Sequence, residues 1–129
     1  MRKILLVEDN EMNRDMLSRR LERCGYSVVS ACTGQQGREF ACSQIPDLIL
    51  MDIGLPDMDG WEVTKLLKSF ERTRNIPIIA LTAHVLVTDR QKAFESGCDD
   101  YDTKPVDFAR LSEKIARLLA RRSCHEVEA

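Results

Sequence analysis

Short apolar runs that alternate with longer segments of helical period constrain the fold of this chain more than any other feature. Runs such as ILLV at 4–7 and LILM at 48–51 contain no polar residue, which is typical of strands buried on both faces. The expected strands are residues 3–7, 27–31, 47–51, 76–81 and 101–103. The expected helices are residues 11–24, 34–43, 59–70, 85–96 and a last one that begins after Asp107. This alternation predicts an α/β fold, a doubly wound (βα)5 parallel sheet with helices on both faces.

Local signals mark several of the helix ends. Gly25 is suited to the position just after the first helix, and Asp59 with Glu62 three residues later resembles a capping box. The segment at 101–103 is a poor strand by propensity, and we include it because the alternation requires a fifth strand.

Length and charge limit the classes of protein that the chain can represent. The 129 residues fit one domain, which we place at 1–121, followed by a short frayed tail at 122–129 without an output domain. Nineteen basic and 21 acidic residues give a net charge of −2, so no basic excess points to nucleic acid. No apolar run is long enough for a membrane helix or a secretory signal, and we expect a cytoplasmic protein with no membrane partner.

The five cysteines do not suggest a disulfide framework or a zinc site. Their number is odd, and no pair has the CxxC spacing of metal ligands. We expect free, mostly buried thiols in a reducing compartment.

Polar side chains stand where the expected strands end. The first strand runs into Glu8 and Asp9, the third into Asp52, the fourth into Thr82 and the fifth into Lys104. Because the carboxyl ends of parallel strands share one edge of a sheet, where ligands bind in doubly wound folds, we expect these side chains to meet.

The residue types at this edge suit phosphoryl transfer. A group of carboxylates favours a hard cation such as Mg²⁺, which relieves their mutual repulsion. A lysine ammonium and a hydroxyl can stabilise a phosphoryl group that is transferred to a carboxylate. Any one of these acids taken alone is more simply explained as a helix cap or turn residue, and the hypothesis rests on their coincidence at one edge.

Four separated segments resemble the receiver domain of bacterial two-component response regulators. They are ILLVEDNEMNR at 4–14, LILMDIGLPDMDGWEV at 48–63, IPIIALTAH at 76–84 and ESGCDDYDTKPVD at 95–107. The resemblance covers residues 2–120, and it implies a flavodoxin-like sheet with strand order 2-1-3-4-5.

The resemblance assigns a role to each residue at the expected edge. It implies that Asp52 is the phosphorylated residue, and that Glu8, Asp9, Asp52 and the backbone carbonyl of Gly54 hold Mg²⁺. Lys104 is expected to pair with the acceptor and then with the phosphoryl group.

Two further residues are implied to form the switch. The Thr82 hydroxyl moves toward the phosphate, and Tyr101 turns inward behind it. The resemblance also implies a cis peptide bond between Lys104 and Pro105. His84, two residues beyond Thr82, borders the site without an assigned role.

The function implied is that of a stand-alone, chemotaxis-type receiver. It would accept a phosphoryl group from a sensor histidine kinase or a histidine phosphotransfer protein, and would signal to an unknown downstream protein by contact. It would catalyse its own phosphorylation and dephosphorylation and turn over no external substrate.

Three alternatives remain open at this point. A haloacid-dehalogenase-type phosphatase would need a second aspartate at the position of Gly54. A nucleotide- or flavin-binding domain would need a glycine-rich turn after the first strand, where the chain has the acidic sequence EDNE. A degenerate scaffold would lack one of the site residues, and none is missing.

Overall fold

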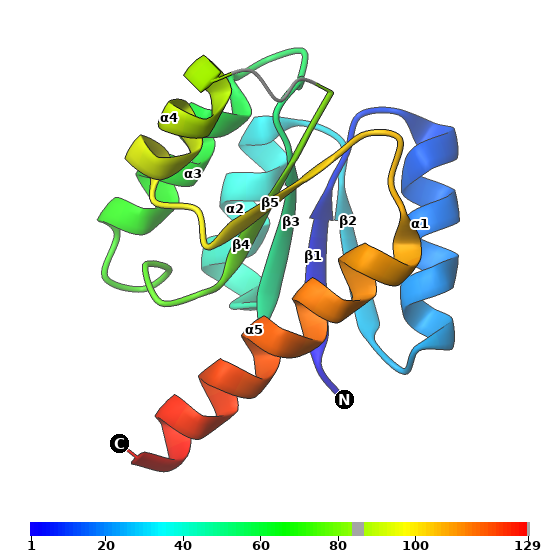
Figure 1. Cartoon of the computed structure of the whole chain (residues 1–129), viewed down its shortest axis with the longest axis vertical. Coiled ribbons are helices and arrows are strands. Elements are labelled where there is room, and N and C mark those ends of the chain that lie inside the picture. The colour runs from blue at the N-terminus through cyan, green and yellow to red at the C-terminus, as the bar shows by residue number, and fades with distance from the viewer. Residues whose placement is uncertain (84–86, 129) are drawn as a thin grey trace.

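The fold is a parallel five-stranded sheet between two layers of helices (Figure 1). The structure is a computed structural model that describes residues 1–83 and 87–128, with side chains left undescribed at 87–89 and 122–128. Its strands are β1 Lys3–Val7, β2 Ser27–Ala31, β3 Leu48–Asp52, β4 Ile78–Thr82 and β5 Asp100–Thr103. Its helices are α1 Glu11–Arg23, α2 Gly34–Gln44, α3 Gly60–Ser69, α4 Val87–Ser96 and α5 Phe108–Glu128. The strand order is β2-β1-β3-β4-β5, as predicted.

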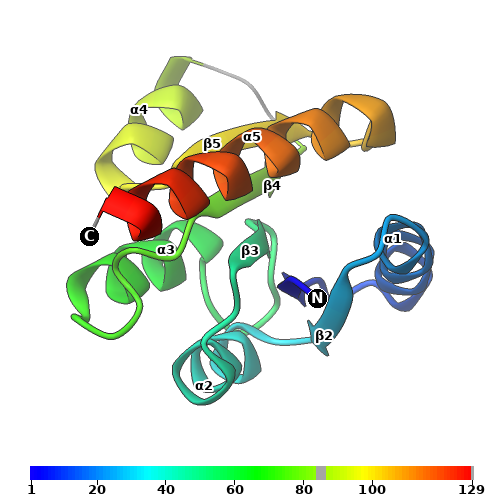
Figure 2. The same ribbon diagram turned by 90° about the horizontal axis from the view of Figure 1, so that it is seen from below.

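Alternate residues of the central strands feed two separate cores. Helices α1 and α5 cover one face of the sheet and α2, α3 and α4 cover the other (Figure 2). Leu6, Leu50 and Leu81 belong to the core under α1 and α5, whereas Val7 and Met51 belong to the core under α2 and α3. Because both faces are covered, β1, β3 and β4 are buried along nearly their whole length, which explains their continuous apolar runs.

Several helix ends follow the predicted local chemistry. Asn10 caps α1, and Gly25 beyond its end has a φ of 93°, a left-handed conformation that glycine adopts without strain. Asp59 caps α3, but its carboxylate accepts from the Trp61 amide at 2.9 Å and not from Glu62, so the cap is confirmed and the full capping box is not seen.

Three expectations about the ends of elements and the thiols are corrected. Strands β3 and β4 each extend one residue further than predicted, because Asp52 and Thr82 still pair with neighbouring strands. Helix α5 continues through Glu128, where a frayed tail was expected, because the segment 109–128 contains no glycine or proline and is rich in helix formers. Cys24 and Cys32 are exposed, not buried, because they follow the ends of α1 and β2; all described cysteines are free.

The described helices include none that is both long enough and apolar enough to cross a membrane.

Candidate functional site

The predicted site residues meet at the carboxyl edge of the sheet. Glu8 follows β1, Asp52 and Thr82 are the last residues of β3 and β4, and Lys104 follows β5. The strand ends are in register: Val7 at the end of β1 lies opposite Met51 of β3, and Thr82 at the end of β4 lies opposite Thr103 of β5. Topology alone therefore brings together side chains that are distant in the sequence.

Lys104 joins two of the acids directly. Its Nζ lies 3.0 Å from Oδ1 of Asp52 and 3.1 Å from Oε2 of Glu8. Glu8 and Asp52 are almost fully buried, so this ammonium supplies the positive charge that two adjacent buried carboxyl groups require. The Lys104–Pro105 peptide bond is cis, as the resemblance implied.

Three carboxyl groups form a cluster suited to a divalent cation. One oxygen from each of Glu8, Asp9 and Asp52 lies within 4.8 Å of the others, with Asp9 exposed to solvent. An all-oxygen donor set with one open side fits Mg²⁺, which keeps part of its water shell. Gly54 lies beside the cluster and its amide donates to Oδ1 of Asp52 at 3.0 Å; metal binding by its carbonyl remains a prediction.

The two buried acids divide one proton unequally. Burial, then a hydrogen bond to Asp52 and the charge of Asp52, raise the pKa of Glu8 to about 7. Burial also acts to raise the pKa of Asp52, but hydrogen bonds from Glu8, Lys104 and the Gly54 amide together lower it. Asp52 is therefore held as the carboxylate, the nucleophilic form, while Glu8 is the acid that takes up a proton near neutral pH when no metal is bound.

Helix α1 supplies two contacts that the sequence prediction did not include. Nδ2 of Asn13 donates to Oε1 of Glu8 at 3.2 Å, and Nη1 of Arg14 donates to the carbonyl oxygen of Glu8 at 2.9 Å. Both residues lie within the segment 4–14 that carried the resemblance, so their proximity in sequence to Glu8 was an available signal. They orient the turn that presents the acidic pair.

Close packing beneath Asp52 also escaped sequence reasoning. A Cβ placed on Gly60 would lie 2.5 Å from the carbonyl oxygen of Asp52 and 2.6 Å from Cα of Ile53. The first turn of α3 can therefore approach the end of β3 only because residue 60 has no side chain.

Thr82 and Tyr101 lie on the face of the sheet that α4 covers. Thr82 follows Ala80 by two residues, and Ala80 is opposite Tyr101, so their side chains point to the same side. Thr82 is buried, whereas Tyr101 is half-buried against the cluster that contains Trp61 and Ala80. This shared face is compatible with the predicted switch pair. His84 lies outside the described residues.

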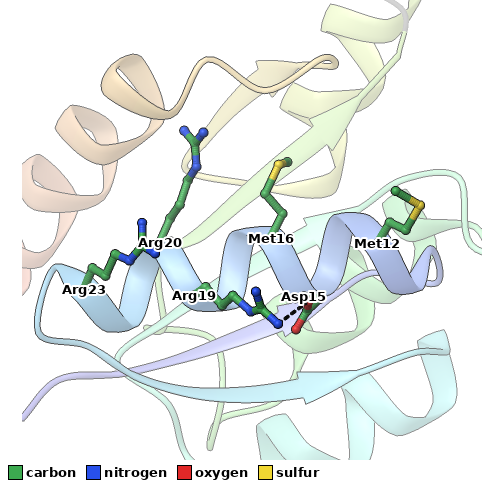
Figure 3. Close-up of a pocket in the computed structure, with 6 residues that line it drawn as sticks. All are labelled: Met12, Asp15, Met16, Arg19, Arg20 and Arg23. Carbon is green, nitrogen blue, oxygen red and sulfur yellow. Dashed lines mark ion pairs between the residues drawn. The ribbon is translucent and has the colours of Figure 1, made fainter.

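A shallow pocket adjoins the acidic cluster on the side of α1. Its volume is about 420 Å³, and Met16, Leu17, Pro105 and Val106 line it together with Glu8 and Lys104, among others. Along the exposed surface of α1 a second pocket is lined by Met12, Asp15, Met16, Arg19, Arg20 and Arg23 (Figure 3). Met12 and Met16 are 81% and 45% exposed, so an uncovered apolar surface borders the site.

Comparison with known proteins assigns residues 4–116 to the response regulator receiver domain family. The chain is 40% identical over 116 residues to the polar-differentiation response regulator DivK of Brucella ovis, covering 90% of this chain and 94% of that protein.

The solved structures of receiver domains superpose closely on this chain. A CheY-like receiver domain from Methanospirillum hungatei superposes with a TM-score of 0.90 at 29% identity, covering 97% of this chain and 98% of that one. The receiver domain of histidine kinase PA1611 from Pseudomonas aeruginosa, solved with a magnesium ion coordinated in its active-site cleft, gives a TM-score of 0.85 at 39% identity and covers 92% of this chain and 98% of that one.

Proposed function

The chain belongs to the response regulator receiver domain family, and from this membership we propose that Asp52 accepts a phosphoryl group from a phosphohistidine. The observation that carries the proposal is the Lys104 ammonium bridging Asp52 and Glu8 at 3.0 and 3.1 Å within a three-carboxylate cluster. A nucleophilic carboxylate, a fixed cation and a divalent-metal site are what the transfer requires.

The residues divide the chemistry among them. A carboxylate oxygen of Asp52 forms the bond to phosphorus while the bond from phosphorus to the histidine nitrogen of the donor breaks, and the released imidazole takes up a proton. Lys104 then contacts the phosphoryl oxygens and balances part of their charge. Mg²⁺ held by Glu8, Asp9 and Asp52 would neutralise negative charge at the same oxygens.

The donor protein would approach over α1. Exposed Met12 and Met16 lie along this helix, and Met16 also lines the pocket that reaches Glu8 and Lys104. A histidine kinase or histidine phosphotransfer protein that docks on this surface brings its phosphohistidine to the open side of the cluster. Met16→Glu should slow transfer from such a protein and leave phosphorylation by acetyl phosphate unchanged; an equal loss with both donors would contradict this approach.

Signalling would follow from the charge that the modification adds. Phosphorylation brings roughly −1.5 to −2 charge to the edge of the sheet. Thr82 would donate to the new phosphoryl oxygen, and Tyr101 on the same face would move into the space behind it. The changed surface around Tyr101 would then be recognised by a downstream protein.

We expect that this receiver domain acts in the cytoplasm and has no external substrate. Gly54 stands where a haloacid-dehalogenase-type phosphatase would need its second aspartate, so a phosphomonoester such as p-nitrophenyl phosphate should not be turned over.

The first test is the mass of the intact protein after incubation with acetyl phosphate. One added phosphoryl group that requires Mg²⁺ and is absent in Asp52→Asn is expected, because the amide is a poor nucleophile. Incubation with beryllofluoride, a stable mimic of the phosphoryl group, controls for rapid hydrolysis. If the protein shows no added mass and also binds no beryllofluoride, that result favours a degenerate scaffold and removes the role of Asp52.

A further inference from the structure

A buried acid lies on β5 among apolar neighbours. Asp102 is only 3% exposed and stands opposite Leu81, so its side chain points to the face that α5 covers. Leu81 and Leu111 belong to the hydrophobic core on this face. A carboxylate at such a position requires a specific explanation, because burying a charge is costly unless it is paired.

The partner of Asp102 is Arg110 on α5. Nη2 and Nε of Arg110 lie 2.6 and 2.9 Å from the same oxygen, Oδ1, which also accepts from the Thr103 amide at 2.8 Å. The arginine additionally donates to Oγ1 of Thr103 at 3.3 Å. One carboxylate oxygen therefore ties together the last residue of β5 and the first turn of α5.

The other oxygen of Asp102 makes this arrangement poor as a source of stability. Among the described side chains, Oδ2 of Asp102 is the buried polar atom without a hydrogen-bond partner. An unsatisfied buried acceptor lowers stability, and an apolar residue at this position would face the hydrophobic core that contains Leu81 without that cost. The ion pair is better explained by the geometry that it imposes.

That geometry concerns the loop that carries Lys104. Asp102 lies two residues before Lys104 and Arg110 six residues after it, so the ion pair closes the turn between β5 and α5. A second contact closes the same turn at the start of α5, where Oδ1 of Asp107 accepts a hydrogen bond from the Arg110 amide at 3.3 Å. In Figure 1 this turn extends from the end of β5 toward α1 before α5 begins.

The ammonium of Lys104 can reach its partners reliably only if the backbone of Lys104 is held in place. A lysine reaches its target through four flexible methylene groups, so its side chain does little to direct the ammonium by itself. Nζ nevertheless has to lie near 3 Å from both Asp52 and Glu8, and later to contact the phosphoryl group. The position of the Lys104 backbone therefore controls how often the ammonium is in place.

We propose that the Asp102–Arg110 ion pair is a positioning element for Lys104, which clamps the β5–α5 turn so that the ammonium stands over the acceptor Asp52. The proposal rests on the proposed phosphorylation of Asp52. Asp102 and Arg110 touch neither the acceptor nor the metal ligands, and they act only through the turn.

The test compares the phosphorylation rate with magnesium affinity in Asp102→Asn and Arg110→Ala. Each variant should be phosphorylated by acetyl phosphate about tenfold more slowly or worse, with Mg²⁺ affinity unchanged within about twofold, because Lys104 is not a metal ligand. The double variant should lose no more than either single one, since the pair acts as a unit. If Asp102→Asn does not fold, Asp102→Leu keeps the core packed and breaks the same contact.

A double-mutant cycle with Lys104→Ala separates positioning from a general structural effect. Affinity for beryllofluoride at saturating Mg²⁺ should fall in Asp102→Asn, but the same substitution should have no further effect when Lys104 is already alanine. Asp99→Asn is the matched control. Asp99 also forms an ion pair, with Lys68 at 2.8 Å, but it lies at the starts of β4 and β5, at the end of the sheet away from Lys104. This control should phosphorylate at the normal rate.

Three results would overturn the inference. They are a normal phosphorylation rate per folded molecule in Asp102→Asn, an equal loss in Asp99→Asn, and full additivity in the Lys104→Ala background. If the unmodified protein gains no phosphoryl group and binds no beryllofluoride, the proposed function itself fails, which is a separate outcome.

Discussion

Magnesium binding should weaken about tenfold when the pH is lowered from 8 to 6, because Glu8 takes up a proton over this range in the metal-free protein. Burial, with the adjacent Asp52, raises the pKa of Glu8 from 4.5 to about 7. The carboxyl group is 1% exposed and contacts Asn13 and Lys104 as well as Asp52. A cation entering this cluster has to displace the proton, so metal affinity becomes dependent on pH.

The size of the effect follows from simple competition between one proton and one metal ion. The apparent Kd is multiplied by one plus the ratio of the proton concentration to the acid dissociation constant of Glu8. With the pKa at about 7, this factor is about 11 at pH 6, about 2 at pH 7 and about 1.1 at pH 8. The ratio between pH 6 and pH 8 is therefore about tenfold.

The same protonation fixes the direction in which stability changes with pH. Between pH 4.5 and about 7, the folded metal-free protein holds one proton on Glu8 that the unfolded chain has lost. The Glu8 contribution to the free energy of unfolding is thus present below this window and lost as the pH rises through it. Asp52 has a lowered pKa, so its contribution is present above its ordinary value of 3.8 and is lost only in stronger acid. Without metal, Tm should fall between pH 5 and 7.5, and saturating Mg²⁺ should reverse this fall.

Calorimetric titration with Mg²⁺ at pH 6, 7 and 8 measures both the affinity and the protons released. Two buffers of different ionisation enthalpy should report about one proton released near pH 6 and almost none at pH 8. Glu8→Gln should bind more weakly and lose the pH dependence. Because histidines titrate in the same range, this variant decides the assignment. An affinity that is equal at pH 6 and pH 8, or a dependence retained in Glu8→Gln, would refute the reasoning.

Three further changes test other parts of the site. Lys104→Ala should leave the calorimetric Mg²⁺ affinity unchanged or tighter, while phosphorylation followed by intact mass slows by about 10²–10³-fold; weaker metal binding would mean that the lysine organises the carboxylates. Thr82→Ala should still be phosphorylated, but beryllofluoride should no longer shift the NMR signals of Tyr101, and an undiminished shift would disprove the coupling. Gly60→Ala should lower the stability by about 1–3 kcal/mol, since its Cβ would lie 2.5 Å from the Asp52 carbonyl oxygen. Calorimetric Tm measures this last effect against Gly54→Ala, whose Cβ meets its nearest atom at 3.9 Å.

Periodicity predicted the elements of the fold well where burial is uniform. Strand β1 has the predicted bounds, and β3 and β4 differ by one or two residues, because apolar runs record burial on both faces. Strand β2 also has the predicted bounds, although it is only partly buried. The ends of elements were less accurate. The continuation of α5 beyond residue 120 follows the helix-forming composition of this segment, and no hydrophobic period in the sequence marks it.

The sequence by itself determined that a parallel sheet would form and that Glu8, Asp9, Asp52, Thr82 and Lys104 would share one edge, because strand ends in a parallel sheet coincide regardless of distance along the chain. Only the tertiary structure decided which of these side chains touch, and which neighbours adjust them. The raised pKa of Glu8, the close approach at Gly60 and the ion pair between Asp102 and Arg110 all arise from the packing of separate elements. Local pattern reports whether a residue is buried, whereas its partner depends on how whole helices and strands pack against one another.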